Sequence, residues 1–169
     1  MNLTFRKGTP EDAALFVNFL DEIKSEMQQK DWLYLDPPEL VHSMITDGTM
    51  SFWIVMDGEA TAGVCSVLYP GSRADNYGYD LDFTEEELLQ VVHMDTVAVH
   101  QTYRGLGLQQ QMARFVESML TGQGSRILLS TVHPDNTFSL NNMLLQGYAV
   151  QKRIGKYDSE RLLLRKNIF

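Results

Sequence analysis

Hydrophobic and polar residues alternate along this chain, and the period of the alternation predicts most of its helices and strands. Residues 3–8 alternate with a period of two, which is typical of a short strand. Apolar residues then recur at helical spacing. Thr9 before Pro10 marks the start of this helix, because threonine caps helices and proline fits their first turn. Residues 36–45 predict a second, shorter helix, and two β-rich runs within residues 50–70 predict a hairpin.

The second half of the chain shows the strongest single elements. Residues 91–99 predict a strand, and residues 106–124 predict an amphipathic helix that ends at Gly122 or Gly124. The apolar face of that helix is expected to hold Leu108, Met112, Phe115, Val116 and Met119. The other predicted elements are a loop at 71–83, a helical turn at 84–90, a strand at 126–132, a helix at 134–147 and a final hairpin over 148–168.

The order of these elements predicts a mixed α/β fold. It reads β-α-α-β-β-loop-β-α-β-α-β-β, with no internal repeat and no interdomain linker. The strand-helix-strand unit at 91–132 should pair in parallel, whereas the first half of the chain should be antiparallel. At 169 residues the chain has the length of about one domain. We therefore expect a single domain over residues 1–169, with a mixed, twisted sheet of about six or seven strands and helices on both faces.

Composition places the chain among ordinary globular domains. It is 44% hydrophobic and 21% charged, and no apolar run is long enough to cross a membrane. The first residues lack the basic start and apolar stretch of a signal peptide. Cys65, the single cysteine, excludes an internal disulfide and fits a reducing cytosol. We expect a cytoplasmic protein without a membrane partner.

The formal charge of −8 is unevenly distributed. Residues 71–100 hold seven carboxylates against one arginine, whereas residues 101–169 hold nine Lys or Arg against four acids. The acidic balance argues against nucleic acid as the main partner. The basic C-terminal part can still bind a small anion, although both regions are equally well explained as solvated faces.

Two glycines, Gly105 and Gly107, follow Arg104 where the best strand gives way to the best helix. A helix N-terminus has unpaired N–H groups and a partial positive charge, so glycines there allow a phosphate to come close. The alternative is a plain turn whose glycines supply positive φ. Gln110 stands where a dinucleotide fingerprint needs a third glycine, and no Gly-Lys-Ser/Thr occurs, so two common phosphate motifs are excluded.

This segment resembles the signature of the GCN5-related N-acetyltransferases, the GNAT superfamily. In that signature a strand ends in an apolar-x-Val pattern, here Val97-Ala98-Val99, and Arg/Gln-x-x-Gly-x-Gly/Ala opens the next helix. Residues 104–109 match it except that Gln109 replaces the final Gly/Ala. Farther along, Asn136, Ser139 and Gly147-Tyr148 stand at the spacing that the family often shows. The resemblance is strongest over residues 91–150, and the order of elements fits the family along the whole chain.

The resemblance implies that acetyl-CoA binds between strands 91–99 and 126–132, which splay apart at the cofactor. The pyrophosphate would lie on the amides of residues 105–110, and the pantetheine arm would pair with Val97 and Val99 like an added strand. A backbone N–H near Val97 would polarise the thioester carbonyl. The cofactor contacts implied are Val97, Ala98, Val99, Arg104, Gly105, Leu106, Gly107, Leu108, Gln109, Gln110, Asn136, Ser139 and Met143.

The reaction implied by the resemblance is direct attack of a primary amine, on a small molecule or a peptide, on the thioester in a ternary complex. Many members place a tyrosine that serves as the acid seven residues after the asparagine, but Met143 stands there and cannot donate a proton. The position that holds a base in some members is His93, and Asp95 shares its strand face. The alternative is a hydrogen-bonded strand histidine beside a strand-edge charge.

For the acceptor amine the candidates are Tyr34, Tyr79 and Asp80, which lie in loop-like segments where the family shapes its acceptor pocket. Aromatic faces and carboxylates would hold a cationic amine, although an acidic surface loop explains them equally well. Cys65 is expected to be a buried small hydrophobe, with a nucleophilic thiol as the alternative. No His, Cys, Asp or Glu spacing indicates a metal site.

Two rival functions stay open. The methionine at position 143 motivates a catalytically idle acyl-CoA-binding or sensor domain, for which His93→Ala would change neither binding nor turnover. A protein-interaction module of the same fold would not bind CoA at all. The acceptor, the acyl length and a homodimeric state are left undecided by the sequence.

Overall fold

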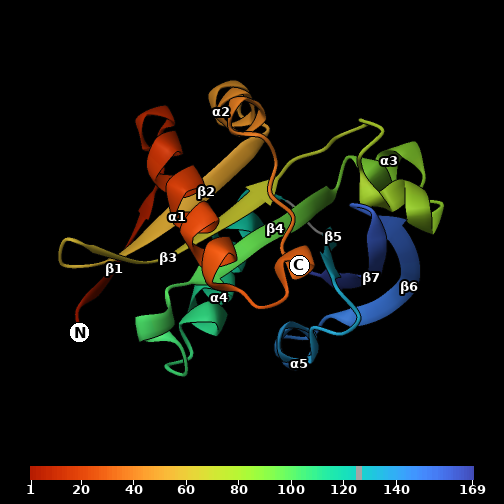
Figure 1. Ribbon diagram of the computed structural model, residues 1–169. Helices are drawn as coiled ribbons and strands as arrows, with labels where there is room; N and C mark the ends of the chain where they lie inside the picture. Colours follow the sequence, from red (N-terminus) through yellow and green to blue (C-terminus); the bar gives the residue numbers. More distant parts are fainter. Residues whose placement is uncertain (125–126) are drawn as a thin grey trace. The chain divides into compact units, whose positions relative to one another are not determined.

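The structure is a computed structural model that describes residues 1–124 and 127–169 (Figure 1). Its strands are β1 Leu3–Lys7, β2 Met50–Asp57, β3 Ala60–Leu68, β4 Val91–Val99, β5 Ile127–Val132, β6 Ala149–Lys156 and β7 Ser159–Asn167. They form a seven-stranded sheet in the order β1-β2-β3-β4-β5-β7-β6, in which β4 and β5 run parallel. The predicted mixed α/β sheet and its parallel unit are confirmed.

The helices also follow the predicted order. The α-helices are α1 Ala13–Glu26, α2 Pro38–Asp47, α3 Glu85–Leu88, α4 Leu108–Thr121 and α5 Thr137–Leu145. Short 3-10 helices lie at Pro10–Asp12, Lys30–Trp32, Tyr77–Leu81 and Gln101–Tyr103. The segment predicted as a loop over 71–83 therefore contains a helical turn, because Asn76 caps it by accepting a hydrogen bond from Gly78 N at 2.8 Å.

The chain divides into two compact units, residues 1–68 with 96–113 and residues 69–95 with 114–169. The division falls inside strand β4, after residue 95, and inside helix α4, after residue 113, so each of these elements belongs partly to both units. The expectation of one domain over residues 1–169 stays a prediction, and the two units are described separately below.

The first unit packs α1 and α2 against β2 and β3. The hairpin predicted within residues 50–70 is formed by β2 and β3 and turns at Gly58, whose left-handed φ of +62° glycine adopts readily. Phe16 of α1 lies on Phe52 of β2, with ring centres 4.9 Å apart. Each such buried aromatic or aliphatic side chain contributes about 1.5–3 kcal/mol. The cluster joins Ala13, Phe16, Phe19, Leu20, Ile23, Val41, Met44, Ile45, Met50, Phe52, Ile54, Val64, Leu68 and Ala98.

The second unit is built on β5, which pairs with β4 on one edge and with β7 on the other. The parallel ladder joins Val91–His93 to Ile127–Leu129. Directly after it, the Ser130 hydroxyl donates a hydrogen bond to Met94 O at 2.8 Å, so a side chain takes up a carbonyl where that ladder stops.

The prediction of which α4 residues form its buried apolar face is wrong at one position. Met119 is 42% exposed, whereas Leu120 is fully buried. Leu108, Met112, Val116 and Leu120 continue the buried stripe at steps of four residues, and Met119 falls beside it. The helix begins only at Leu108, because Gly107 has a left-handed φ that no helical residue adopts.

A carboxylate fixes the start of the first helical segment. Asp12 accepts hydrogen bonds from Arg6 Nη1 at 2.7 Å, Arg6 Nη2 at 2.8 Å and Thr9 N at 2.9 Å. The Arg6 guanidinium and the Thr9 amide hold the pKa of Asp12 well below its ordinary value of 3.8. This ties β1 to the chain that enters α1.

Replacing Asp12 with Asn should lower the free energy of unfolding by about 1 kcal/mol at pH 7, a value discounted for partial exposure. Because the folded-state pKa lies below the unfolded one, the stabilisation is complete above about pH 5 and is lost progressively as the pH falls below about 4. Urea unfolding at pH 7 and pH 3 should therefore show a smaller difference between the two proteins at the lower pH. An equal difference at both pH values would show that the ion pair is not its cause.

Candidate functional site

The turn before α4 has a backbone that only glycine tolerates well. Gly105 has φ +76° and Gly107 has φ +71°, both in the left-handed region. Nothing lies within 4 Å of where a Cβ would stand at either residue, so packing does not demand glycine there. A residue with a side chain would cost about 1–2 kcal/mol at each position through backbone strain alone. The local conformation explains the glycines, and it leaves open space in front of the turn.

That open space faces the N-terminus of a long helix. Helix α4 has 14 residues, and its first amides carry the partial positive charge of a helix start. Arg104 and Leu106 are exposed beside it. Within the described part of the chain the Arg104 guanidinium makes no ion pair or hydrogen bond. An exposed helix start, a free guanidinium and open space form an arrangement that can bind an anion such as a phosphate.

Strand β4 presents one backbone edge next to this turn. His100 N donates to Ala62 O of β3 at 2.9 Å, and Ala98 O would lie 2.9 Å from a Cβ on Gly63. Since backbone groups of successive strand residues point to opposite edges, the amides of Val97 and Val99 point away from β3. An edge of this kind can pair with an extended ligand as an added strand would.

His93 is buried, at 2% exposure, and is held from two sides in the second unit. Its Nε2 accepts a hydrogen bond from Tyr77 N at 3.1 Å, and its ring stacks on the Tyr77 ring at 3.9 Å. Burial lowers the pKa of His93 to about 3. The lone pair that a base would use is already engaged, so these contacts describe the hydrogen-bonded strand histidine. The general-base role of His93 stays a prediction.

Asp95 is exposed, and its charge acts on the same tyrosine. Burial first, and then the neighbouring Tyr157 and Asp95, raise the pKa of Tyr77 above its ordinary value. The Tyr77 and Tyr157 hydroxyls share a hydrogen bond, and Lys156 Nζ lies 5.6 Å from the centre of the Tyr77 ring. Of the two predicted base residues, His93 contacts this buried tyrosine directly, and Asp95 acts on it through its charge.

Sequence reasoning missed Tyr157. It occupies the two-residue turn between β6 and β7 with φ +55°, next to Asp158 with φ +58°. Neither residue is the glycine or asparagine that such turns prefer, so no turn signal marks the position. Its partner Tyr77 lies 80 residues away in the sequence.

The downstream motif has a local structural reason. Asn136 caps α5, since its Oδ1 accepts a hydrogen bond from Ser139 N at 3.2 Å. An asparagine and the residue three places later are the usual partners at a helix start. Met143 lies half-buried in the same helix. The predicted cofactor roles of these residues are not tested by these contacts.

The three predicted acceptor residues are divided between the units. Tyr34 is exposed in the first unit, whereas Tyr79 and Asp80 belong to the second. The Tyr79 hydroxyl donates to Ser72 O at 2.7 Å. Lys156 Nζ lies 3.9 Å from the Asp80 carboxylate, so the charge expected to attract an amine already has a cation beside it. Their acceptor role stays a prediction, and these contacts favour the surface-loop alternative for Asp80.

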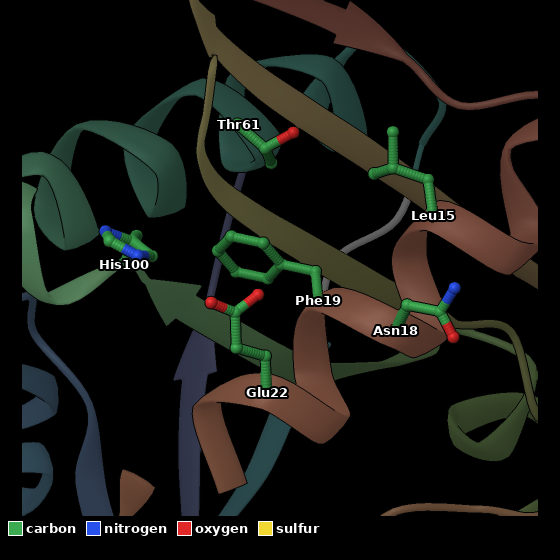
Figure 2. Close-up of a pocket in the computed structure, with 6 residues that line it drawn as sticks. All are labelled: Leu15, Asn18, Phe19, Glu22, Thr61 and His100. Atoms are coloured by element: carbon green, nitrogen blue, oxygen red, sulfur yellow. The ribbon is translucent and has the colours of Figure 1, made fainter. Parts of the chain in front are cut away.

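A pocket that the sequence did not predict lies in the first unit (Figure 2). It has a volume of about 420 Å³. Helix α1 supplies most of its wall, and β3 and the residue after β4 supply the rest. The lining residues are Leu15, Asn18, Phe19, Glu22, Thr61 and His100.

Other candidate chemistry is limited. Cys65 is fully buried, and burial raises the pKa of its thiol to about 12, so it is a protonated packing residue and a poor nucleophile. Among the described residues no three His, Cys, Asp or Glu side chains are placed to hold a metal ion. No helix in the described ranges combines the length and the apolar character needed to cross a membrane.

Comparison with known proteins gives one family. A family model described as the acetyltransferase (GNAT) family matches residues 17–148. A GNAT-family acetyltransferase from Streptococcus pneumoniae has a TM-score of 0.74 at 16% identity, over 99% of this chain and 100% of that one. NAA60 of Arabidopsis thaliana in complex with acetyl-CoA has a TM-score of 0.78 at 15% identity, over 99% of both chains.

A further structure, the putative acetyltransferase yncA from Salmonella typhimurium with its cofactor acetyl-CoA, has a TM-score of 0.73 at 13% identity. It covers 99% of this chain and 94% of that one. At these identities the likeness to solved structures concerns the fold. No curated protein matches the sequence.

The buried imidazole should make stability fall with acid. Because the folded pKa of His93 is about 3 and its ordinary value is 6.5, the unfolded chain binds one more proton between these pH values. The unfolding free energy should therefore drop by about 2 kcal/mol from pH 7 to pH 5 through this group alone. His93→Gln should remove that part of the drop in urea titrations, whereas the exposed His42→Gln should keep it. Equal drops in both variants would contradict the assignment.

Proposed function

The chain belongs to the acetyltransferase (GNAT) family, and from this premise we propose that it transfers an acetyl group from acetyl-CoA to a primary amine of a small molecule or peptide. The observation that carries the proposal is the glycine turn at the start of α4. Its two left-handed glycines leave open space before a helix N-terminus, with the Arg104 guanidinium exposed beside it.

In this proposal the pyrophosphate of acetyl-CoA lies on the amides of residues 105–110. Arg104 adds a charge-assisted contact, and the pantetheine arm pairs with the backbone of Val97 and Val99, whose amides point away from β3. Gln109 fits this arrangement provided that its side chain points away from the phosphates. Asn136, Ser139 and Met143 stay proposed cofactor contacts on the family pattern alone.

The proposed chemistry is a direct transfer in a ternary complex. The acceptor ammonium first loses a proton, and the amine nitrogen then attacks the thioester carbon. The carbon–sulfur bond breaks, the nitrogen loses a second proton, and the leaving thiolate takes one up. The sum is one acetamide, one CoA thiol and one released proton. The Val97 N–H is proposed to stabilise the negative oxygen of the tetrahedral intermediate.

The proton acceptor is proposed to be Asp95, acting directly or through one water. Of the two residues at the predicted base positions it is the exposed one, whereas the His93 nitrogen is engaged by the Tyr77 amide. In this proposal His93 holds Tyr77 in place, since its ring stacks on the Tyr77 ring and its Nε2 accepts the Tyr77 N–H. Met143 stands where many family members have the tyrosine that serves as the acid. Because methionine cannot donate a proton, a catalytically idle acyl-CoA-binding domain is the second candidate function.

Acetyl-CoA should raise the melting temperature of the protein, because a ligand that binds only the folded state stabilises it by about 2.7 kcal/mol at a concentration of 100 Kd. NADH should not. Arg104→Ala should weaken acetyl-CoA binding by about tenfold through loss of a charge-assisted contact. Arg114→Ala, an exposed arginine later on α4, is the matched control and should bind normally. No shift with any CoA species would remove the cofactor proposal.

Measurements of turnover distinguish an acetyltransferase from a catalytically idle acyl-CoA-binding domain. With acetyl-CoA and a panel of primary amines, the wild type should release CoA thiol, and Asp95→Asn should lower kcat by about 100-fold while keeping its affinity for acetyl-CoA. A protein that binds acetyl-CoA tightly but releases no thiol with any amine would be the sensor instead. An unchanged kcat in Asp95→Asn would place the base elsewhere.

A further inference from the structure

The pocket of the first unit has the size of a small-molecule site and a mixed apolar and polar lining. Its volume of about 420 Å³ lies in the range of ligand pockets. Four of its residues, Leu15, Asn18, Phe19 and Glu22, recur along one face of α1. Leu15 and Phe19 supply apolar surface, and the polar groups lie around it (Figure 2).

The charge of the lining favours a cation. Glu22 is the one carboxylate among the lining residues, and none of them is lysine or arginine. The Glu22 carboxylate has no hydrogen bond or ion pair with any described residue. Figure 2 shows that it points toward the Phe19 ring, on the side where His100 lies. An ammonium group placed there would gain a charge-assisted hydrogen bond.

In the neutral ring of His100, the nitrogen that could accept a hydrogen bond is already engaged. Its Nδ1 accepts a hydrogen bond from Thr102 N at 3.2 Å, so in the neutral ring the proton sits on Nε2. The free nitrogen of His100 is therefore a donor. The Glu22 carboxylate, the negative charge of the lining, would form an ion pair with an ammonium held there. An ammonium paired with Glu22 has no lone pair, so while it is bound there its nitrogen is not the attacking one.

The separation between the proposed thioester position and the pocket also indicates that the amine in the pocket is not the reacting one. The thioester carbonyl is proposed to lie at the Val97 amide, three residues before His100. At the rise of a strand this separates the two points by about 10 Å. An attacking nitrogen has to be about 3–3.5 Å from the carbonyl carbon. The His100 side of the pocket is thus about 10 Å from that carbonyl along the chain, farther than an attacking nitrogen can be, and it suits a second ammonium.

We infer that the pocket holds a second, unreacting ammonium of the acceptor, so that the acceptor is a linear diamine or polyamine. Glu22 binds this ammonium, the aliphatic chain passes over Leu15 and Phe19, and the amine about 10 Å away is acetylated. The inference rests on the proposed function, because it uses the cofactor position assigned there. It adds the class of substrate and the residue that selects it.

Steady-state kinetics with spermidine and hexylamine test the inference. The wild type should show a KM for spermidine about tenfold or more below that for hexylamine. In Glu22→Gln that preference should fall about tenfold, through the KM for spermidine and not its kcat. Glu26→Gln removes an exposed glutamate one turn later on α1 that does not line the pocket, and it should keep the preference.

Calorimetry of spermidine binding without acetyl-CoA gives a readout that does not need turnover. The heat of binding should be present in the wild type and in Glu26→Gln and lost in Glu22→Gln. If the protein binds acetyl-CoA and acetylates both amines with equal KM, or if both glutamate variants behave alike, the inference is overturned while the proposed function stands. If no CoA species binds at all, the proposed function is overturned and the acceptor assignment with it.

Discussion

Backbone hydrogen bonding along β4 is the constraint on which the candidate site depends. A strand offers donors and acceptors on both edges, and groups left without a partner inside a protein are costly. Near its end β4 gives one edge to β3 through His100 N and Ala62 O. Its earlier residues, up to His93, pair with β5 in parallel. Val97 and Val99 then point their amides to the edge opposite β3, where a ligand can complete the pairing.

The glycine turn shows how one local conformation serves two purposes. Positive φ at Gly105 and Gly107 is needed to bring the chain from β4 into α4, and this would explain the glycines without any ligand. The same conformation leaves nothing within 4 Å of either missing Cβ, in front of the helix start. A plain turn and a phosphate site are therefore compatible descriptions of this segment.

Local patterns in the sequence predicted the order of the main helices and strands but not the contacts of the site. Periodicity predicted β4, α4 and their parallel unit, because spacing along one element is a local property. The link of Tyr77 to Tyr157 and the ion pair of Asp80 with Lys156 join residues more than 70 positions apart, and neither pattern nor motif reports them. Glu22 belongs to no sequence motif, and only the fold brings it to one pocket with Thr61 and His100.

Cys65 has a practical consequence for labelling. It is the sole cysteine in the sequence, and burial together with its raised pKa leaves its sulfur shielded and protonated. A thiol introduced at any exposed position would consequently be the group that maleimide reagents reach first. For such labelling the protein behaves as if it had no cysteine. A single fluorophore or spin label can therefore be attached without first replacing Cys65 in the core.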